Sequence, residues 1–446
     1  MKKIITLCAS LMVAASASWC EAGAKEKGTV VDKSQFVSVK GTAFTQNNKA
    51  YYVTGTNMWY GGYIGSTTKV GDRARLVKEL DSLQAMGVNN IRVLAMSEKA
   101  THNSGVKPAI MNDFGQFDDE LLSGLDFLLA EMGKRNMTAV LYLNNFWQWS
   151  GGMTQYMSWI EGTPAIDPNV SKDYEAFCEK SASFYKSKKA QDEWHKAIKK
   201  VVTRVNAITG KPYTQDPAIL SWQLANEPRP GNWKVSAADK AVYVKWVDES
   251  AKYIHSLDAN HMVSTGAEGL MGAVNDDKLY METHASKNVD YMTYHMWIRN
   301  WGWFDQHKPA ETWDAGWAKG QEYLNVHIDM AKKVGKPIVL EEFGLDRDMG
   351  AYDPKSTTQI RDKFYRKVFD TLLPRIQAGE PIAGYNFWAW NGAARTPRAN
   401  HWWQQGDDFM GDPPQEEQGM YGVFDSDVST ILLIKEFNDK VQAQAK

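Results

Sequence analysis

Apolar residues recur along this chain in a regular alternation, in which a short, strongly apolar run is followed by a longer amphipathic one. The short runs are rich in β-branched and aromatic residues and are flanked by Gly or Pro, which is typical of buried parallel strands. Eight such strands are predicted, at residues 51–59, 88–96, 137–147, 219–228, 261–269, 289–297, 337–344 and 382–390.

The amphipathic segments predict helices, because their apolar residues recur with the period of one helix face. They cover residues 73–86, 118–135, 191–205, 237–257, 317–334 and 357–377, with a closing helix near 431–441 and only a short signal at 276–285. Eight strands that alternate with helices are the pattern of an α/β fold of the (β/α)8 or TIM barrel type. A doubly wound sheet favours a glycine-rich phosphate turn after its first strand, and residues 55–58 (Gly-Thr-Asn-Met) are not one. We therefore expect a single barrel, with a long loop after strand eight.

The pattern of the N-terminal residues predicts a targeting signal rather than a helix or strand of the fold. Lys2 and Lys3 precede an apolar run at residues 4–17, and small residues at 22–24 offer a cleavage site, so residues 1–24 are interpreted as a signal peptide. We expect an exported protein, secreted or periplasmic. Cys20 admits a lipoprotein anchor, but Trp19 stands where lipid-attachment sequences favour a small residue.

No linker or repeat divides the rest of the chain, so residues 25–446 are assigned to one catalytic domain. No later stretch reaches the ~20 apolar residues that a membrane span requires. With 51 Lys+Arg against 53 Asp+Glu, the formal charge of -2 also argues against a nucleic-acid partner or an anionic membrane surface. The chain contains 18 Trp, and such an excess favours a flat ligand that stacks on indoles.

Catalytic groups of a TIM barrel lie where its strands end. Glu227 ends the fourth predicted strand, and Glu341 and Glu342 end the seventh. Hydrolysis of a glycosidic bond needs two carboxyl groups, one that protonates the leaving oxygen and one that attacks or stabilises the anomeric carbon, and a separation of about 5–5.5 Å predicts retention. Because adjacent side chains of a strand point to opposite faces, at most one of Glu341 and Glu342 is expected inside the barrel.

Three further polar residues lie near these strand ends. Asn226 directly precedes Glu227 and is able to bond a sugar hydroxyl. Arg92 lies in an apolar run and needs a partner, either a nucleophilic carboxylate that it keeps ionised or a structural ion pair. His295 is either a core histidine or a donor to the sugar or to a catalytic carboxylate. Neither a metal-ligand cluster nor a phosphate loop occurs among the strand ends, so we expect no metal and no organic cofactor.

Several of these segments together resemble glycoside hydrolase family 5. They are residues 90–92 (Asn-Ile-Arg), 222–228 (Trp-Gln-Leu-Ala-Asn-Glu-Pro) and 337–344 (Pro-Ile-Val-Leu-Glu-Glu-Phe-Gly). The sequence more closely resembles the mannanase subfamily at residues 144–147 (Asn-Asn-Phe-Trp), 387–390 (Phe-Trp-Ala-Trp) and 412–425. The resemblance extends from about residue 35 to the end of the sequence.

The resemblance implies roles for individual residues. Glu227 matches the acid/base of the family, and Glu342, directly before Phe-Gly, matches its nucleophile. Arg92, Asn226 and His295 match the residues that support this pair, and Trp388 matches the indole platform under the sugar. Further candidates for substrate contacts are Trp59, Trp147, Trp149, Trp297 and Arg395.

One position departs from the common family pattern. Many members have a Tyr two residues after the His, whereas this chain has Trp297, whose N–H donates but cannot accept a hydrogen bond. Trp297 is therefore either a partner of the nucleophile or a sugar contact.

These observations predict retaining hydrolysis of β-1,4-mannosidic linkages in mannan, glucomannan or galactomannan, with endo action favoured. The alternatives are an exo-acting β-mannosidase on manno-oligosaccharides, an endo-β-1,4-glucanase, and a barrel that binds carbohydrate without catalysis. Residues 391–418, the long loop after the eighth strand, either shape extra subsites or wall off one end of the cleft. The sequence leaves the oligomeric state open.

Overall fold

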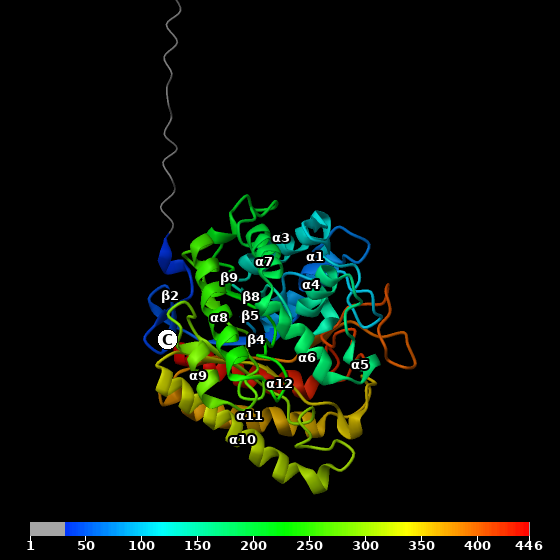
Figure 1. The fold of residues 1–446 in the computed structure, drawn as a ribbon. Coiled ribbons are helices and arrows are strands. Elements are labelled where there is room, and N and C mark those ends of the chain that lie inside the picture. Colours follow the sequence, from blue (N-terminus) through cyan, green and yellow to red (C-terminus); the bar gives the residue numbers. More distant parts are fainter. Residues whose placement is uncertain (1–31, 446) are drawn as a thin grey trace, which may run out of the picture. The chain divides into compact units, whose positions relative to one another are not determined.

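Eight parallel strands form the central sheet of the computed structural model, which describes residues 32–445 (Figure 1). Their order in the sheet is β10 (Met262–Ser264), β9 (Ile219–Gln223), β8 (Thr138–Tyr142), β5 (Asn90–Leu94), β4 (Val53–Asn57), β13 (Ile382–Phe387), β12 (Ile338–Phe343) and β11 (Met292–Met296). A parallel bridge between Ser264 and Tyr291 links the two ends of this order. The strands therefore close into a ring, and the predicted (β/α)8 barrel is confirmed.

Helices cover the outside of this ring, and each strand candidate of the sequence is followed by one (Figure 1). The long helices are α2 (Arg73–Ala85), α3 (Asp119–Lys134), α7 (Lys188–Val202), α8 (Ala237–Leu257), α9 (Asp277–Ala285), α10 (Pro309–Val334), α11 (Gln359–Gln377) and α12 (Val428–Gln442). Two begin earlier than their apolar pattern indicates. Helix α7 starts after Ser187, whose side chain accepts the Ala190 N–H, and α10 starts at Pro309, which is well suited to a first helical position.

The base of the barrel is closed by a segment that the sequence pattern did not predict. Three short antiparallel strands, β1 (Ser38–Lys40), β2 (Ala43–Gln46) and β3 (Lys49–Tyr51), precede β4. Phe44 of β2 packs with Val53, Val140, Leu220 and other apolar residues from the strands of the barrel. Strands of three or four residues with mixed polarity carry too little periodicity to be recognised from sequence alone.

Further short elements lie in the connections. They are α1 (Gly61–Gly65), α4 (Gly152–Glu161), α5 (Pro168–Ser171), α6 (Tyr174–Ser183), the hairpin of β6 (Met111–Asp113) and β7 (Gln116–Phe117), and 3-10 helices at Lys33–Gln35, Gln148–Ser150, Phe184–Lys186, Tyr213–Gln215, Asp348–Gly350 and Ala443–Ala445. Helices α4 to α6 all lie between β8 and α7, so this connection is much longer than an ordinary βα loop.

The loop after the eighth barrel strand is anchored at both ends. Strand β14 (Trp390–Gly392) pairs in parallel with β15 (Val423–Phe424), which brings the two ends of residues 391–418 together. Within the loop, the buried Asp412 carboxylate accepts hydrogen bonds from the backbone N–H groups of Gly419 and Tyr421. The predicted long loop is therefore confirmed, and it is held in place by buried polar groups.

The predicted signal peptide, residues 1–24, lies outside the described residues. From Lys33 onward the chain forms one compact unit, and the assignment of residues 25–446 to a single catalytic domain stays a prediction. Among residues 32–445, helices long and apolar enough to cross a membrane do not occur.

Candidate active site

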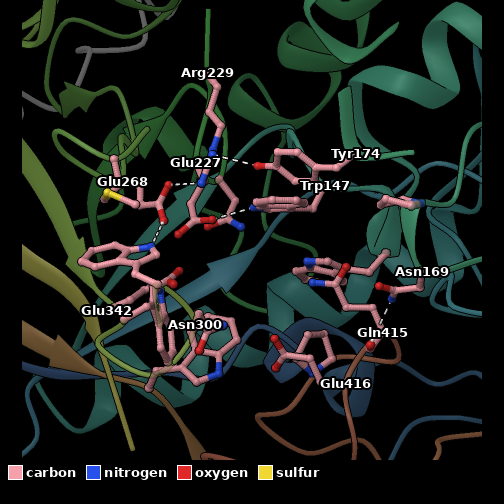
Figure 2. A pocket seen from close by; sticks show the side chains of 18 of the residues that line it. Trp147, Asn169, Tyr174, Glu227, Arg229, Glu268, Asn300, Glu342, Gln415 and Glu416 are labelled. Atoms are coloured by element: carbon pink, nitrogen blue, oxygen red, sulfur yellow. Dashed lines mark hydrogen bonds and ion pairs between the residues drawn. The ribbon is translucent and has the colours of Figure 1, made fainter. Parts of the chain in front are cut away.

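Five predicted site residues converge at the C-terminal end of the barrel strands. Arg92 comes from β5, His295 from β11 and Glu342 from β12, while Asn226 and Glu227 lie three and four residues after the end of β9. Each of these residues is 6% exposed or less. Asn226, Glu227 and Glu342 line a pocket of ≈610 Å³ (Figure 2). The register of the parallel strands thus brings together groups that are up to 250 positions apart in sequence.

Arg92 donates hydrogen bonds to several members of this cluster. Its Nη1 donates to Glu342 Oε1 at 2.5 Å, its Nη2 donates to Asn226 Oδ1 at 2.8 Å, and its Nε donates to Gln223 Oε1 at 2.8 Å. A fully buried guanidinium is stable only when it is paired and hydrogen-bonded, and here every nitrogen has a partner. Arg92 therefore fixes the Glu342 carboxylate and the Asn226 amide relative to one another.

His295 lies between the two carboxyl groups that were predicted to be catalytic. Its Nδ1 is 2.7 Å from Glu227 Oε1 and 3.2 Å from Glu342 Oε2. Burial lowers the pKa of His295, but the charges and hydrogen bonds of Glu342 and Glu227 outweigh burial and raise this pKa to about 9. The two contacts decide between a core histidine and a partner of the carboxylates in favour of the latter, and the raised pKa favours the protonated imidazole at neutral pH.

Glu227 is held in an unusual backbone conformation. Its φ angle is 50°, in the left-handed region that non-glycine residues rarely adopt. Its Oε2 accepts a hydrogen bond of 2.5 Å from Trp147 Nε1, which Figure 2 shows as a dashed line. Burial raises the pKa of Glu227, whereas the hydrogen bond and charge of His295 lower it, and the pKa lies below its usual value. A strained residue with a perturbed pKa in a pocket is a strong functional candidate.

The structure corrects the expectation that only one of the two neighbouring glutamates enters the barrel. Residue pairing between β11 and β12 shifts here, since Tyr294 pairs with Leu340 but His295 pairs with Glu342. Glu341 is the extra residue of this bulge. Its carboxylate is fully buried and lies 3.7 Å from Arg92 Nε, so both carboxylates contact the same arginine. A bulge breaks the strict alternation of side chains on which the expectation rested.

Four of the predicted indoles line the pocket, namely Trp147, Trp149, Trp297 and Trp388. The Nε1 of Trp388 is buried and has no hydrogen-bond partner within residues 32–445. Trp297 packs edge-on against Trp388, with ring centroids 5.8 Å apart. Since no hydrogen bond joins Trp297 to Glu342 in the described part of the chain, its place at the pocket wall favours a sugar contact over a role as partner of the nucleophile.

Two predicted substrate contacts lie away from this pocket. Trp59 is 1% exposed, and its Nε1 donates to the backbone oxygen of Gly411 beneath the loop of residues 391–418. Arg395 pairs with Asp425 and stacks on Phe424 at the base of the same loop. Both residues therefore hold the loop. Sequence order placed them near strand ends but carried no information on where their side chains point.

Other pocket residues were not assigned from sequence. Arg229 donates a hydrogen bond to the Tyr174 hydroxyl and pairs with Glu268 (Figure 2). The other oxygen of Glu268 accepts from Trp301 Nε1. Burial raises the pKa of Glu268 to about 7, although Arg229 acts against this rise. Arg229 lies two residues after Glu227, and Glu268 ends the fifth predicted strand. The position of both residues at a strand end could therefore have indicated that they belong to the site. Tyr174 and Trp301 lie in connections, where no such signal was present.

The loop of residues 391–418 also reaches this pocket. Pro413, Gln415 and Glu416 form part of the pocket wall, and the Asn169 side chain donates to the Gln415 backbone oxygen at 3.3 Å (Figure 2). Burial raises the pKa of Glu416 well above its usual value, and its Oε2 has no hydrogen-bond partner among the described residues. The loop thus carries a polar group without a protein partner into the wall of the pocket.

Glu227, His295 and Glu342 also have the spacing of a metal site, because one potential ligand atom of each lies within 4.8 Å of the others. A cation in this place would compete with donors that already occupy the carboxylates. Arg92 donates to Glu342 and Trp147 donates to Glu227, and the positive charge of Arg92 repels a second cation. The arrangement is better suited to proton transfer and nucleophilic attack than to metal binding.

Comparison with known proteins agrees with this chemistry. A family model described as GH family 5 beta-mannosidase-like matches residues 34–446. Mannan endo-1,4-beta-mannosidase 4 of Solanum lycopersicum is 29% identical over 365 residues, which are 79% of this chain and 82% of that protein. Mannan endo-1,4-beta-mannosidase 1 of Arabidopsis thaliana is 26% identical over 375 residues, which are 80% of this chain and 82% of that protein.

Solved structures show the same relationship. The crystal structure of the glycoside hydrolase family 5 mannosidase from Rhizomucor miehei matches with a TM-score of 0.85 and 33% identity, over 93% of this chain and 99% of that one. The endo-beta-1,4-mannanase from Thermotoga petrophila matches with a TM-score of 0.64 and 23% identity, over 88% of this chain and 77% of that one, which indicates a shared fold.

Proposed function

The chain belongs to glycoside hydrolase family 5, among its beta-mannosidase-like members, and from this premise we propose that it hydrolyses β-1,4-mannosidic linkages in mannan and in the oligosaccharides derived from it. One observation carries the proposal. Two buried carboxyl groups, those of Glu227 and Glu342, reach within 4.8 Å of one another at a pocket lined by indoles. The relatives that are named mannan endo-1,4-beta-mannosidases and mannosidases support the choice of a β-mannan substrate.

Glu342 is the proposed nucleophile. Arg92 places a positive charge 2.5 Å from its Oε1, which stabilises the carboxylate that attacks the anomeric carbon. Attack forms a bond between a Glu342 oxygen and the anomeric carbon and breaks the bond from that carbon to the leaving oxygen. A distance below 5 Å between oxygens of the two carboxyl groups supports retention, since inverting enzymes need about 6.5–9.5 Å to admit a water.

Glu227 is the proposed acid/base. The protonated Nδ1 of His295 lies 2.7 Å from Glu227 Oε1, so the proton that the leaving oxygen receives is available within this hydrogen bond. Formation of the glycosyl-enzyme removes the negative charge of Glu342, which is the main charge that raises the pKa of His295. In the second step Glu227 takes a proton from water, which attacks the same carbon and releases Glu342.

Endo action was favoured from the sequence, and several curated relatives carry an endo name. One structural observation supports exo action as the second candidate. Residues 413–416 of the loop after β13 form part of the pocket wall and join the segment of Asn169 by a hydrogen bond. A wall of this kind limits how far a polysaccharide extends past the cleavage point and favours release of single sugars from a chain end.

A time course of products on linear mannan and on mannopentaose tests both candidates. Endo action gives a ladder of oligosaccharides from the first minutes, while exo action gives mannose and a substrate shortened by one unit. Under exo action, mannotriose and mannopentaose are cleaved at similar rates, and the viscosity of galactomannan falls slowly. Hydrolysis of cellulose oligosaccharides with no hydrolysis of mannan would contradict the proposed function and would favour the endo-glucanase alternative.

We also propose that the protein is exported. The proposal rests on the basic, apolar and small-residue pattern of residues 1–24. The N-terminal sequence of the mature protein, isolated from its own host and compared between culture medium and cell fractions, tests it. An intact Met1 on the mature protein would contradict it.

A further inference from the structure

A second cavity, of ≈530 Å³, lies next to the active-site pocket. Asn169 lines both cavities, and Pro414 lines the second while its neighbours Pro413 and Gln415 line the first. The segments of Asn169 and of residues 413–415 therefore contribute to both cavities. Three stretches that are remote in sequence contribute to the second cavity, at residues 103–107, 167–170 and 402–414.

The lining of this cavity has the chemistry of a site for a neutral sugar. Of the tryptophans in the described part of the chain, only Trp233 and Trp402 are exposed, at 47% and 39%. Trp233 lines the active-site pocket and Trp402 lines the second cavity. An exposed indole offers a flat apolar face for the C–H face of a pyranose, and amides offer both donors and acceptors to hydroxyls. The amide side chains of the second cavity are those of Asn103, Asn169, Gln404 and Gln405.

The acidic group of the cavity is already satisfied. Asp167 accepts hydrogen bonds from Ser104 and Gln148, so its carboxylate is already occupied. Lys107 brings one positive charge to the lining, and its ammonium group donates hydrogen bonds that sugar hydroxyls accept. Because four amides and an exposed indole stand beside this one charge, the lining fits an uncharged polysaccharide.

We propose that this second cavity binds a segment of β-1,4-linked mannan outside the active site. The proposal rests on the proposed function, because it takes its ligand from the substrate of the neighbouring pocket. A chain held at Trp402 stays beside the active site, so the local concentration of scissile linkages rises without any change in the catalytic groups.

Electrophoresis in native gels that contain soluble galactomannan tests the site. The inactive Glu342→Ala protein serves as the parent, so that the polysaccharide is not digested during the run. Trp402→Ala in this background is expected to weaken retardation between about two- and tenfold, which corresponds to the loss of one stacking contact. Leu432→Ala is the matched control, since Leu432 is an exposed apolar residue of α12, at 60%.

Activity on an aryl β-mannoside separates this proposal from the proposed function. Trp402→Ala in the active protein is expected to hydrolyse the aryl mannoside with unchanged kcat and KM, and to lose rate only on polymeric mannan at low concentration. Unchanged retardation of Trp402→Ala, with a normal rate on the aryl mannoside, would overturn the second site and leave the enzyme assignment standing. Absence of hydrolysis of both mannan and the aryl mannoside by the wild-type protein would instead overturn the proposed function.

A second inference rests on the bulge that brings Glu341 into the barrel. Gln223 Nε2 donates to both Glu341 oxygens, at 2.9 and 2.7 Å. The oxygen of the same amide accepts from Arg92 Nε at 2.8 Å. Gln223 Nε2 also donates to Ser264 Oγ at 3.0 Å, so Glu341 supplies two of the three acceptors of this amide nitrogen. Together with the Arg92 N–H they fix which way the Gln223 amide faces, because the reversed amide would put its NH2 group against the Arg92 N–H.

The orientation of Gln223 matters because Arg92 binds the nucleophile. With Nε held by Gln223, the two terminal nitrogens of Arg92 point to Glu342 and Asn226. We infer that Glu341 is a positioning residue for catalysis, which acts on Glu342 through Gln223 and Arg92. A displacement of about 1 Å in a reacting group is enough to lower a rate about a hundredfold.

Two substitutions separate this role from simple packing. Glu341→Gln keeps an oxygen acceptor for Gln223 and is expected to retain most of kcat. Glu341→Leu removes both carboxylate acceptors, leaves Gln223 Nε2 with Ser264 Oγ, and is expected to lower kcat by about a hundredfold with little change in KM. The rate of covalent trapping by a 2-deoxy-2-fluoro-mannosyl fluoride, which reports the attack of Glu342 alone, is expected to fall in parallel with kcat.

Gln223→Leu removes the amide that joins Glu341 to Arg92. This variant replaces Glu341→Leu in the test if Glu341→Leu does not fold. Equal losses in the Gln and Leu variants of residue 341 would overturn the positioning role, as would an unchanged trapping rate in Gln223→Leu or in Glu341→Leu.

Discussion

Replacement of Glu342 by Ala is expected to lower kcat on manno-oligosaccharides by more than about a thousandfold, because it removes the carboxylate on which the proposed covalent intermediate forms. The chain should remain folded. Arg92 keeps hydrogen bonds to Asn57, Asn226 and Gln223 when Glu342 is removed, and Glu341 lies 3.7 Å from its Nε. The guanidinium is therefore not left as an isolated buried charge.

Steady-state rates on mannotriose, together with thermal unfolding of wild type and variant, measure this effect. Azide added to Glu342→Ala should restore turnover and yield the α-mannosyl azide, because a small anion fits the space left by the carboxylate and attacks from the same side. Glu322→Ala, an exposed carboxylate of α10, is the matched control and should behave as wild type. More than a tenth of wild-type activity in Glu342→Ala would contradict the nucleophile assignment.

Replacement of Glu227 by Ala is expected to lower kcat by about 10²–10⁴-fold on manno-oligosaccharides, the range that general acid–base catalysis contributes. The loss should depend on the leaving group. An aryl mannoside with an acidic phenol needs no proton from Glu227, so its first step stays fast and the glycosyl-enzyme accumulates. The deficit then lies in the second step, because no base activates the water.

A burst of phenol followed by a slow steady state, recorded by rapid mixing, is the kinetic signature of this variant. Azide should accelerate the steady state and give the β-mannosyl azide, the opposite anomer to the one expected for Glu342→Ala. Trp147→Phe is a useful comparison, since it removes the hydrogen bond to Glu227 Oε2 but keeps an aromatic ring in the pocket wall and the Glu227 carboxyl group itself, and it should give a smaller loss with no burst. The same azide anomer from both glutamate variants would contradict the assignment of separate roles.

The eight strand candidates of the sequence correspond to the eight strands of the barrel, and the helix between residues 237 and 257 has the predicted bounds. These successes share a cause. A strand that is buried on both faces must be apolar along its whole length, and a helix that covers it must be apolar on one face. The hydrophobic pattern of each element can therefore be recognised within its own stretch of sequence. The strands β1 to β3 and the helices α4 to α6 were not predicted from the sequence, because they are short and depend on contacts with distant residues.

The candidate site divides in the same way. Chain order was enough to bring Arg92, Asn226, Glu227, His295 and Glu342 to one end of the barrel, because parallel strands end at a common edge. It was not enough to say which indoles face the pocket. Trp59 follows β4 as closely as other candidates follow their strands, but its side chain is buried beneath the loop of residues 391–418.

The sequence by itself thus determined the barrel, the edge at which chemistry takes place and, through motif resemblance, the two glutamates proposed for catalysis. Only the tertiary structure decided that Glu341 also enters the barrel, that His295 bridges the two carboxylates, and that residues 413–416 close part of the pocket. The physical reason is the distance along the sequence over which each feature is determined. Burial patterns arise from each residue's own immediate surroundings, whereas a bulge, a shared hydrogen bond and the path of a long loop depend on pairs of residues that only the folded chain brings together.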